Sequence, residues 1–154
     1  MERTLVLIKP DAIQRGLIGD IITRLERKGL KLIGMKMMNL DEATLDDHYR
    51  HLLDRPFFPR IKQFMRSAPV LALCWEGLEC VETVRTLCGT TNSRKADPGT
   101  VRGDLGMSVQ CNLVHASDSS QTAQEEITRF FRPDELFSYE SVTDAVIYSS
   151  DERG

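Results

Sequence analysis

Hydrophobic positions along the chain follow two spacings, and their alternation predicts the order of strands and helices. Four short apolar runs bounded by turn-forming residues are typical of buried strands, and they cover residues 4–9, 30–38, 69–75 and 109–114. Between these runs, apolar residues recur every three or four positions, as in an amphipathic helix. This second spacing covers residues 17–28, 41–55, 57–65, 78–88 and 117–131. The predicted order is therefore β-α-β-αα-β-α-β-α.

Residues at the ends of these segments favour the same boundaries. Gly29 follows the last apolar position of the first helix, where a glycine commonly ends a helix. Asp41 has a short acceptor side chain suited to cap the next helix, and Pro56 is expected to end that helix. Of the adjacent side chains Phe57 and Phe58, we expect one to be buried in the core and the other to be exposed.

The order of elements indicates the fold class. Two β-α-β halves with helices on one side of the sheet are typical of an α+β, ferredoxin-like fold, here with a helical excursion between the second and third strands. Residues 90–106 show no sustained period, and so long a loop in a compact domain is usually functional. We expect a single domain over residues 1–154, with 149–154 as a loose tail.

Composition and charge argue against a nucleic-acid-binding protein and against a membrane protein. The net charge of −3 provides no global basic field that would favour a nucleic acid partner. No apolar run approaches the roughly 20 residues of a membrane span, and a strand follows Met1 at once, so we expect neither a membrane anchor nor a signal peptide. The cysteines lack CxxC spacing and occur in apolar or periodic stretches, which favours buried thiols in a reducing compartment. They are Cys74, Cys80, Cys88 and Cys111.

His115 is the candidate for covalent chemistry. It lies where a short apolar strand meets the capping residues of a helix, and such a joint can hold a reactive group rigidly. A neutral imidazole is a good nucleophile near neutral pH, although a buried histidine bonded to the backbone is the alternative. His48 and His51 have the i, i+3 spacing of helical metal ligands, but no third ligand is evident. We therefore expect no metal ion held directly by protein side chains.

Several basic and hydroxyl side chains could hold phosphates. The chain has no Gly-rich loop ending in Gly-Lys-Ser/Thr, so side chains would have to bind them. The candidates are Lys9, Arg85, Thr91 and Arg102. Arginine presents a planar fork to phosphate oxygens and lysine a compact charge. Each basic candidate could instead be a solvated surface residue, but Lys9 ends an apolar strand just before Pro-Asp, which argues for a specific role.

Five segments, in one order and at matching separations, carry a more specific signal. They are ERTLVLIKPDAIQRG at 2–16, DRPFFP at 54–59, GTTN at 89–92, PGTVRGDLG at 98–106 and NLVHASDS at 112–119. Through them the chain resembles the nucleoside diphosphate kinase family, from about residue 2 to about residue 148. The resemblance implies a four-stranded antiparallel sheet with a long nucleotide-site loop. It also implies transfer of the terminal phosphate of a nucleoside triphosphate to a nucleoside diphosphate, by a ping-pong mechanism through phosphohistidine.

The resemblance assigns roles in catalysis. His115 matches the phosphorylated histidine of the family. Glu126 matches the acceptor that orients the other ring nitrogen, with the neighbouring Glu125 left as the alternative. Ser117 matches a serine that bonds the phosphate region, and helix capping is the alternative role for it.

The resemblance also assigns residues to the nucleotide. Lys9 would reach the ribose and the phosphates, and Asn112 would bond the sugar. Phe57 would stack on the base with Val109 nearby, which suits any base because every base has a π-face. The residues that would surround the phosphates are Tyr49, Arg85, Thr91 and Arg102.

Three positions depart from the family pattern. Ala116 stands where the family usually has glycine, and it would be strained if that position requires positive φ. Ser93 replaces a common proline and Leu105 a common phenylalanine. None of the three removes a catalytic group, so they bear on rate and loop rigidity.

The resemblance implies Mg²⁺ as the cofactor, held mainly by the nucleotide phosphates. ATP and other nucleoside tri- and diphosphates are the implied partners, in the cytoplasm, with no membrane and no specific nucleic acid. The family is oligomeric, as hexamers or tetramers built on a shared dimer. The segment after Pro133 resembles the longer tail of hexameric members, so a homo-hexamer is favoured over a tetramer.

Two functions of other classes are alternatives to this one. A catalytically silent family member could act as a scaffold or regulator, but the presence of His115, Lys9, Arg102 and Glu126 argues against it. A ferredoxin-like RNA-binding module would need exposed aromatic residues on its strands and a basic sheet face. The first and third strands here are aliphatic instead, which argues against that module.

Overall fold

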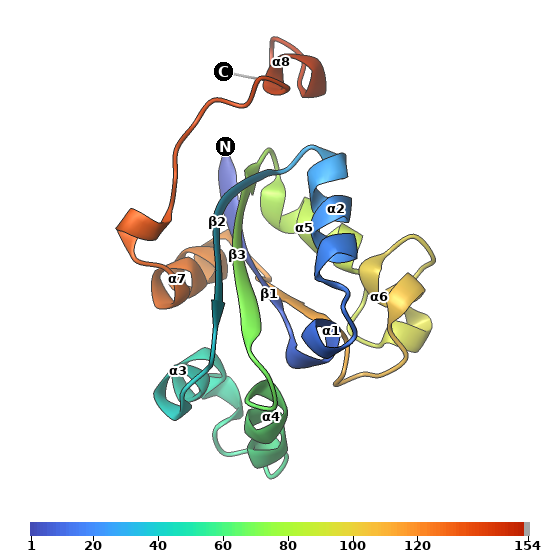
Figure 1. Ribbon diagram of the computed structural model, residues 1–154, viewed down its shortest axis with the longest axis vertical. Helices are drawn as coiled ribbons and strands as arrows, with labels where there is room; N and C mark the ends of the chain where they lie inside the picture. Colours follow the sequence, from blue (N-terminus) through green and yellow to red (C-terminus); the bar gives the residue numbers. More distant parts are fainter. Residues whose placement is uncertain (153–154) are drawn as a thin grey trace.

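The centre of the fold is a four-stranded antiparallel sheet. The computed structural model describes residues 1–152. Its strands are β1 (Glu2–Ile8), β2 (Lys31–Met38), β3 (Val70–Gly77) and β4 (Val114–Ala116). They lie in the order β2-β3-β1-β4, and each neighbouring pair is antiparallel (Figure 1). The predicted ferredoxin-like topology is confirmed.

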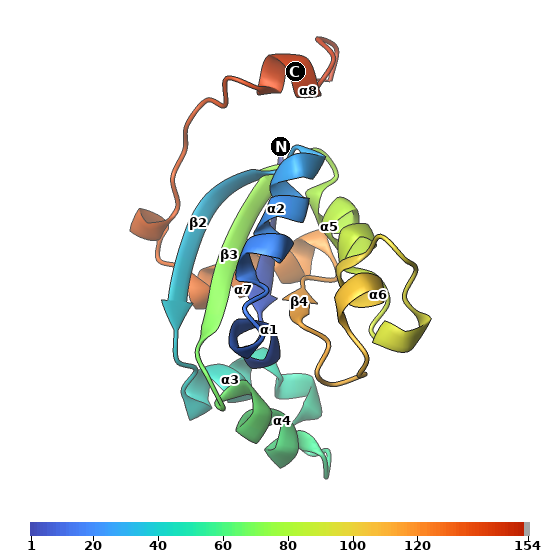
Figure 2. The ribbon, with the colours of Figure 1, turned by 45° about the vertical axis from the view of Figure 1, so that its right-hand side comes forward.

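Helices cover both faces of this sheet (Figure 2). One face packs against α1 (Pro10–Gln14), α2 (Ile18–Lys28) and α5 (Cys80–Cys88). The other packs against α3 (Glu42–His48), α4 (Phe58–Met65) and α7 (Ser120–Phe130). The prediction of helices on one side therefore holds only for the first group. The reason lies in β1, whose residues from Leu5 to Ile8 are all fully buried, so both faces of the sheet need a cover.

Most predicted helix boundaries are confirmed. Gly29 ends α2 in the left-handed region with φ +103°. The Asp41 side chain caps α3 by accepting from the backbone N–H of Thr44 at 2.7 Å. Phe58 is in the core at 5% exposed and Phe57 is 47% exposed, so the pair divides as predicted.

Helix α3 is shorter than its apolar pattern indicated. It ends at His48 rather than near Pro56, and a 3-10 turn, η1 (Arg50–Leu52), follows it. The backbone N–H of Leu52 donates to the carbonyl of Tyr49, an i to i+3 bond. A 3-10 turn keeps apolar side chains at a nearly helical spacing, so the pattern continued past the end of the α-helix.

Two predictions close to the site are wrong. The region predicted as a loop over 90–106 contains two short segments, η2 (Ser93–Lys95) and α6 (Val101–Leu105). Each is too short to display a hydrophobic period. The strand predicted over 109–114 begins only at Val114, because Leu113 has φ +74°, a left-handed conformation that an extended strand cannot contain.

The C-terminal segment follows the outer edge of β2 (Figures 1 and 2). The backbone N–H of Phe137 donates to the Ile33 carbonyl at 2.8 Å. The chain after Pro133 was predicted to be irregular, but it includes η3 (Pro133–Glu135) and α8 (Asp144–Ile147). Residues 150–152 form a turn, while 153 and 154, part of the predicted tail, lie outside the described residues. In the described part of the chain, no helix has the length and apolar character needed to cross a membrane.

Candidate active site

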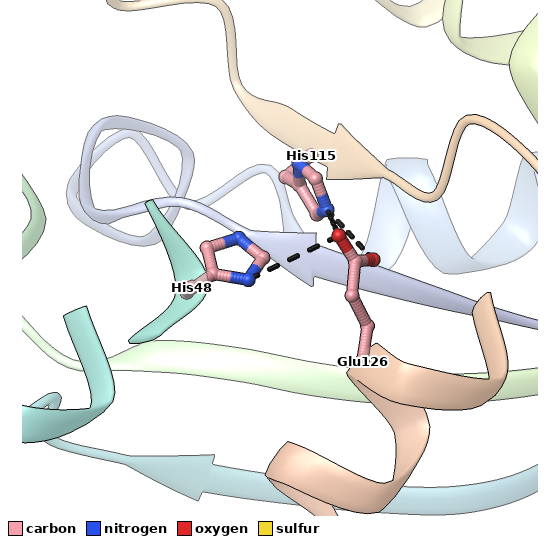
Figure 3. Close-up of side chains that lie close together, drawn as sticks. All are labelled: His48, His115 and Glu126. Carbon is pink, nitrogen blue, oxygen red and sulfur yellow. Dashed lines mark hydrogen bonds and ion pairs between the residues drawn. The ribbon is translucent and has the colours of Figure 1, made fainter. Parts of the chain in front are cut away.

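His115 is held by a strand on one side and a carboxylate on the other. It lies in the middle of β4, opposite Leu7 of β1. Its Nε2 lies 3.0 Å from both carboxylate oxygens of Glu126 on α7 (Figure 3). Because a carboxylate only accepts hydrogen bonds, we assign the proton to Nε2 and the lone pair to Nδ1. Among the described residues, no backbone group bonds the ring of His115, so the alternative of a backbone-bonded histidine is wrong. Nδ1 points away from Glu126 (Figure 3) and can act as the nucleophile.

Glu126 is itself fixed by a second partner. It is 5% exposed, and the Ser117 hydroxyl donates to its carboxylate at 2.6 Å while accepting from the Leu5 N–H at 3.3 Å. Burial alone would raise the pKa of Glu126, but the hydrogen bond and charge of His115, then Ser117, outweigh it and lower the pKa. The carboxylate therefore stays charged. Glu125 is exposed, so Glu126 rather than its neighbour contacts the histidine.

Ser117 does not cap the following helix. Ser119 caps α7 by accepting from the backbone N–H of Thr122 at 3.1 Å, so the capping alternative for Ser117 is wrong. The hydroxyl of Ser117 is buried and committed to Glu126. Ser117 therefore orients the carboxylate that orients His115.

His48 was missed by the sequence analysis as part of this site. Its ring centroid lies 4.6 Å from that of His115 with the planes at 82°, an edge-to-face contact. Burial, and then the neighbouring His115, lower the pKa of His48 to about 3, so the ring is neutral at neutral pH. The signal was a histidine on the apolar face of a helix beside Leu45 and Tyr49. His51, three residues later, is exposed.

A cavity of about 260 Å³ opens beside His115. Besides His115 itself, six residues predicted for the nucleotide or for catalysis line it: Lys9, Tyr49, Arg85, Thr91, Arg102 and Asn112. Further lining comes from residues to which the sequence analysis gave no binding or catalytic role: Cys88, Gly89, Thr90, Val114 and Ala116. Their side chains are small or their contribution is backbone, so residue type alone gave no signal.

Lys9 is part of a chain of polar contacts at the cavity wall. Its Nζ donates to Oδ1 of Asn112 at 2.7 Å, and the Asn112 amide donates to the Thr91 carbonyl at 3.1 Å. Burial, followed by the charge of Arg102, lowers the pKa of Lys9 to about 8. The ammonium is therefore charged at neutral pH but is held at a cost that a bound anion would relieve.

Arg102 ties the cavity wall to the strand that carries His115. Its Nε donates to the Asn112 carbonyl at 3.1 Å, Nη1 to that of Gly89 at 2.7 Å and Nη2 to that of Val114 at 2.6 Å. These bonds use three of the five guanidinium N–H groups. The other two remain for a ligand, so Arg102 can bind phosphate and position β4 at the same time.

Tyr49 and Arg85 complete the polar wall. Tyr49 is the C-cap residue that follows α3. Burial, then the charge of Glu126, raises the pKa of its hydroxyl to about 12. It therefore acts as a neutral hydrogen-bond donor at neutral pH. Arg85 projects from α5 and also lines the neighbouring hollow that contains Glu126.

Three other predictions concern positions at or beyond the rim. Phe57 and Val109 are 47% and 48% exposed and lie outside the cavity lining, so both remain accessible to a ligand.

Among the described non-glycine residues, only Glu79 and Leu113 have positive φ, so Ala116 is unstrained. Cys111 is exposed, unlike the other three cysteines, so the prediction that it is buried is wrong.

The charges of the cavity suit an anionic ligand. Lys9, Arg85 and Arg102 line it, and none of the described lining residues is a carboxylate. Cationic side chains in such a recess attract phosphate oxygens and stabilise charge that moves onto them during transfer. A nucleophilic nitrogen at the edge of this recess can receive a phosphoryl group.

Comparisons with known proteins identify the same family as the sequence motifs. The family model of nucleoside diphosphate kinase matches residues 2–136. The nucleoside diphosphate kinase of Parabacteroides distasonis is 56% identical over 99% of both chains, and that of Staphylococcus haemolyticus is 49% identical over 96% of this chain and 99% of the relative. The Halobacterium salinarum nucleoside diphosphate kinase, solved in complex with CDP, is 46% identical with a TM-score of 0.93, over 96% of this chain and 98% of that chain. The chain therefore belongs to the nucleoside diphosphate kinase family and has the enzyme activity of that family.

Proposed function

We propose that this nucleoside diphosphate kinase carries the transferred phosphate on Nδ1 of His115. The observation that supports this most directly is the contact of Nε2 with both oxygens of Glu126, each at 3.0 Å. That contact favours the tautomer with a lone pair on Nδ1. A catalytically silent scaffold would have no need for the two-step support of His115 by Glu126 and of Glu126 by Ser117.

In the first half-reaction, Nδ1 attacks the terminal phosphorus of a nucleoside triphosphate. The bond from phosphorus to the bridging oxygen breaks, and the nucleoside diphosphate leaves with the electron pair. Positive charge develops on the imidazole, and Glu126 stabilises it through the proton on Nε2. In the second half-reaction, a terminal oxygen of another nucleoside diphosphate attacks the same phosphorus and the P–N bond breaks.

The cavity side chains would hold the nucleotide for both steps. Lys9, Arg85 and Arg102, with Thr91 and the Tyr49 hydroxyl, would bind the phosphates and neutralise charge on the equatorial oxygens. Because the acceptor diphosphate and the product diphosphate have the same chemistry, one set of contacts serves both.

The nucleoside would extend to the rim of the cavity. Asn112 would bond the sugar, together with Lys9. The exposed ring of Phe57 would stack on the base with Val109 nearby. Stacking without base-edge hydrogen bonds would accept purines and pyrimidines alike.

Mg²⁺ would be held by the nucleotide rather than by the protein. A kinase of this family works on nucleotides with a divalent ion, and Mg²⁺ prefers oxygen ligands in an octahedral arrangement. The described lining of the cavity is cationic and without carboxylates, so phosphate oxygens and water are the ligands that fit. When bound, Mg²⁺ would neutralise phosphate charge and hold the chain of phosphates in one conformation.

The assembled enzyme is proposed to be a cytoplasmic homo-oligomer, a hexamer rather than a tetramer. The exposed apolar side chains of the C-terminal segment support association, because several of them are largely uncovered in the single chain. They include Phe137, Val142 and Val146. Sedimentation of the purified protein distinguishes the two assemblies by mass.

The role of His115 is tested with nucleoside triphosphate labelled at its terminal phosphate. The protein with Mg²⁺ should acquire an acid-labile label that a second nucleoside diphosphate removes. His115→Ala should acquire none and should have no turnover, while His51→Ala, which changes an exposed histidine, should behave as wild type. Label on His115→Ala, or full turnover by it, would refute the assignment.

A further inference from the structure

Three side chains from three elements form a compact donor cluster behind the reactive nitrogen. His48 of α3, His115 of β4 and Glu126 of α7 each offer a ligand atom, and these atoms lie within 4.8 Å of one another (Figure 3). Two histidines and one glutamate are a familiar set of zinc ligands. The sequence placed His48 with His51, but the fold supplies its partners from elements far along the chain.

We propose that this cluster is an inhibitory binding site for a transition metal ion, with Zn²⁺ as the reference case. Around a tetrahedral Zn²⁺ with bonds of about 2.0–2.1 Å, ligand atoms lie about 3.3–3.4 Å apart. The distance to the Glu126 carboxylate is 3.0 Å from Nε2 of His115 and 3.9 Å from Nδ1 of His48, which brackets that value. Small shifts would therefore complete three ligands and leave the fourth position for water.

The surroundings of His48 select Nδ1 as its ligand atom, because this nitrogen faces the Glu126 carboxylate. The proton of the ring would then be on Nε2, which is buried and has no hydrogen-bond partner among the described residues, with or without the metal ion. Nη1 of Arg129 lies 3.4 Å from Nδ1 of His48 and opposes a cation. However, Arg129 is paired with Asp47, and Glu126 contributes its own negative charge to the site. The same hollow is lined by acidic Asp118 and Glu125 and by basic Arg50 and Arg85, so its wider charge is mixed.

A metal ion at this site would change the tautomer of His115. Coordination requires the lone pair of Nε2, so the proton now shared with Glu126 must leave that nitrogen for solvent. Nδ1 then takes up a proton from solvent and loses the lone pair that attacks phosphorus. The ion also draws Glu126 away from the imidazole. This consequence rests on the role proposed for Nδ1, whereas the metal site itself does not.

Binding is tested on metal-free protein without nucleotide. Zn²⁺ titrated in competition with a chromophoric chelator should bind with one tight site per chain. His48→Gln should weaken that site by at least about tenfold, because it removes one of three ligands. The matched variant His51→Gln should leave it unchanged. Equal affinity of His48→Gln and wild type, or no tight site at all, would overturn the proposal.

The tautomer is tested on the wild-type chain, so the result does not depend on how a variant folds. The chain has three histidines, and ¹⁵N labelling of their rings lets NMR report each nitrogen. Zn²⁺ should move the Nε2 signal of His115 to that of a metal ligand and should protonate Nδ1. Ring nitrogens of His48 and His115 that do not respond to one equivalent of Zn²⁺ would exclude the site.

Inhibition is the last test. With Mg²⁺ in excess, Zn²⁺ should block phosphorylation of the wild type and of His51→Gln, and a chelator should restore it. His48→Gln should need at least about tenfold more Zn²⁺ for the same block. Zn²⁺ bound at the cluster with undiminished phosphorylation would overturn the inhibitory role. Failure of the proposed function is recognised separately, because it would leave the phosphate label on His115→Ala.

Discussion

At the scale of the residue, each group of the site fixes the next one. The Leu5 N–H bonds Ser117, Ser117 bonds Glu126, and Glu126 bonds Nε2 of His115. The last member can rotate only by breaking both contacts with the carboxylate. The nucleophile is therefore oriented before substrate arrives, and little reorganisation is left for the reaction itself.

Replacing the carboxylate should slow phosphorylation without abolishing it. Glu126→Gln retains a hydrogen-bond acceptor but loses the charge that stabilises the developing imidazolium. A hydrogen bond to a charged group contributes about 1.5–3 kcal/mol, so the rate of phosphohistidine formation should fall roughly 10- to 100-fold. Single-turnover kinetics should show this loss with nearly unchanged nucleotide affinity. Glu125→Gln is the control, and a slow Glu125→Gln with normal Glu126→Gln would reverse the assignment.

Lys9 should make nucleotide binding depend on pH. Its pKa of about 8 means that the ammonium loses its charge as the pH rises through 8. Affinity for a nucleoside diphosphate should therefore be highest at and below neutral pH and fall by about tenfold between pH 7 and pH 9. Titration calorimetry at several pH values measures this. Lys9→Arg keeps its charge over that range, so a pH dependence as steep as that of the wild type would contradict the role of Lys9.

The two adjacent phenylalanines should respond differently to truncation. Phe57→Ala should weaken nucleotide binding by roughly 1–3 kcal/mol, with purines losing more than pyrimidines because their stacked area is larger. Stability should change little, because Phe57 is 47% exposed. Phe58→Ala removes a ring that is 5% exposed and should lower the unfolding free energy by about 3–5 kcal/mol. Unfolding by Phe57→Ala would place that ring in the core instead.

At the scale of the element, the site depends on where β4 begins. Leu113 has φ +74°, its N–H donates to Asp11 at 3.1 Å, and its carbonyl accepts from the Lys9 N–H at 2.8 Å. The start of α1 thus holds an unfavourable backbone conformation just before the strand. This turn sends Asn112 to the cavity and leaves His115 in register with β1.

Helix α2 provides a matched pair of glycine substitutions. Gly29→Ala should lower stability by about 1–2 kcal/mol, because a left-handed position penalises a Cβ. That Cβ would also lie 2.8 Å from Cγ2 of Ile147. Gly19→Ala, inside the same helix with open space around it, should instead raise stability by about 0.5–1 kcal/mol. Urea unfolding of both variants measures the difference, and equal effects would contradict the role of Gly29 as the helix end.

At the scale of the whole molecule, two cores on opposite faces of the sheet meet at the site. Helix α5 brings Arg85 from one face, while α3 and α7 bring Tyr49, His48 and Glu126 from the other. The cavity therefore lies where β4, the short edge strand, leaves room between the two layers.

The buried histidine should make the whole molecule less stable in acid. The unfolded chain binds a proton on His48 near pH 6.5, but the folded chain does so only near pH 3. Stability should therefore be complete above pH 6.5 and fall as the pH is lowered, by about 3 kcal/mol between pH 7 and pH 4. The lowered pKa of Glu126 adds a loss in the same direction. Urea unfolding at a series of pH values measures this free energy. For His48→Gln, the unfolding free energy should depend less steeply on pH than for the wild type, and an equally steep dependence would contradict the prediction.

The sequence by itself determined the parts of this protein that depend on local pattern. Alternation of strand and helix spacing indicated the α+β, ferredoxin-like topology, and Asp41 and Gly29 marked helix ends. The five motif segments indicated the family, and the resemblance implied the antiparallel sheet. These predictions are confirmed because each depends on residues near one another in the chain. Where local geometry changed without a change of spacing, as at the end of α3 and the start of β4, the prediction failed.

Only the tertiary structure decided which distant groups meet. Sequence spacing paired His48 with His51, but packing of α3 against α7 brings His48 to His115 and Glu126. Burial lowers the pKa of Lys9 and of His48. Segments distant in the sequence exclude water from these side chains, so the local sequence pattern does not indicate the shift. The same packing assigns Ser117 to Glu126 and Arg102 to three carbonyl groups. Contacts between distant segments arise from the three-dimensional fold, so they became readable only with the structure.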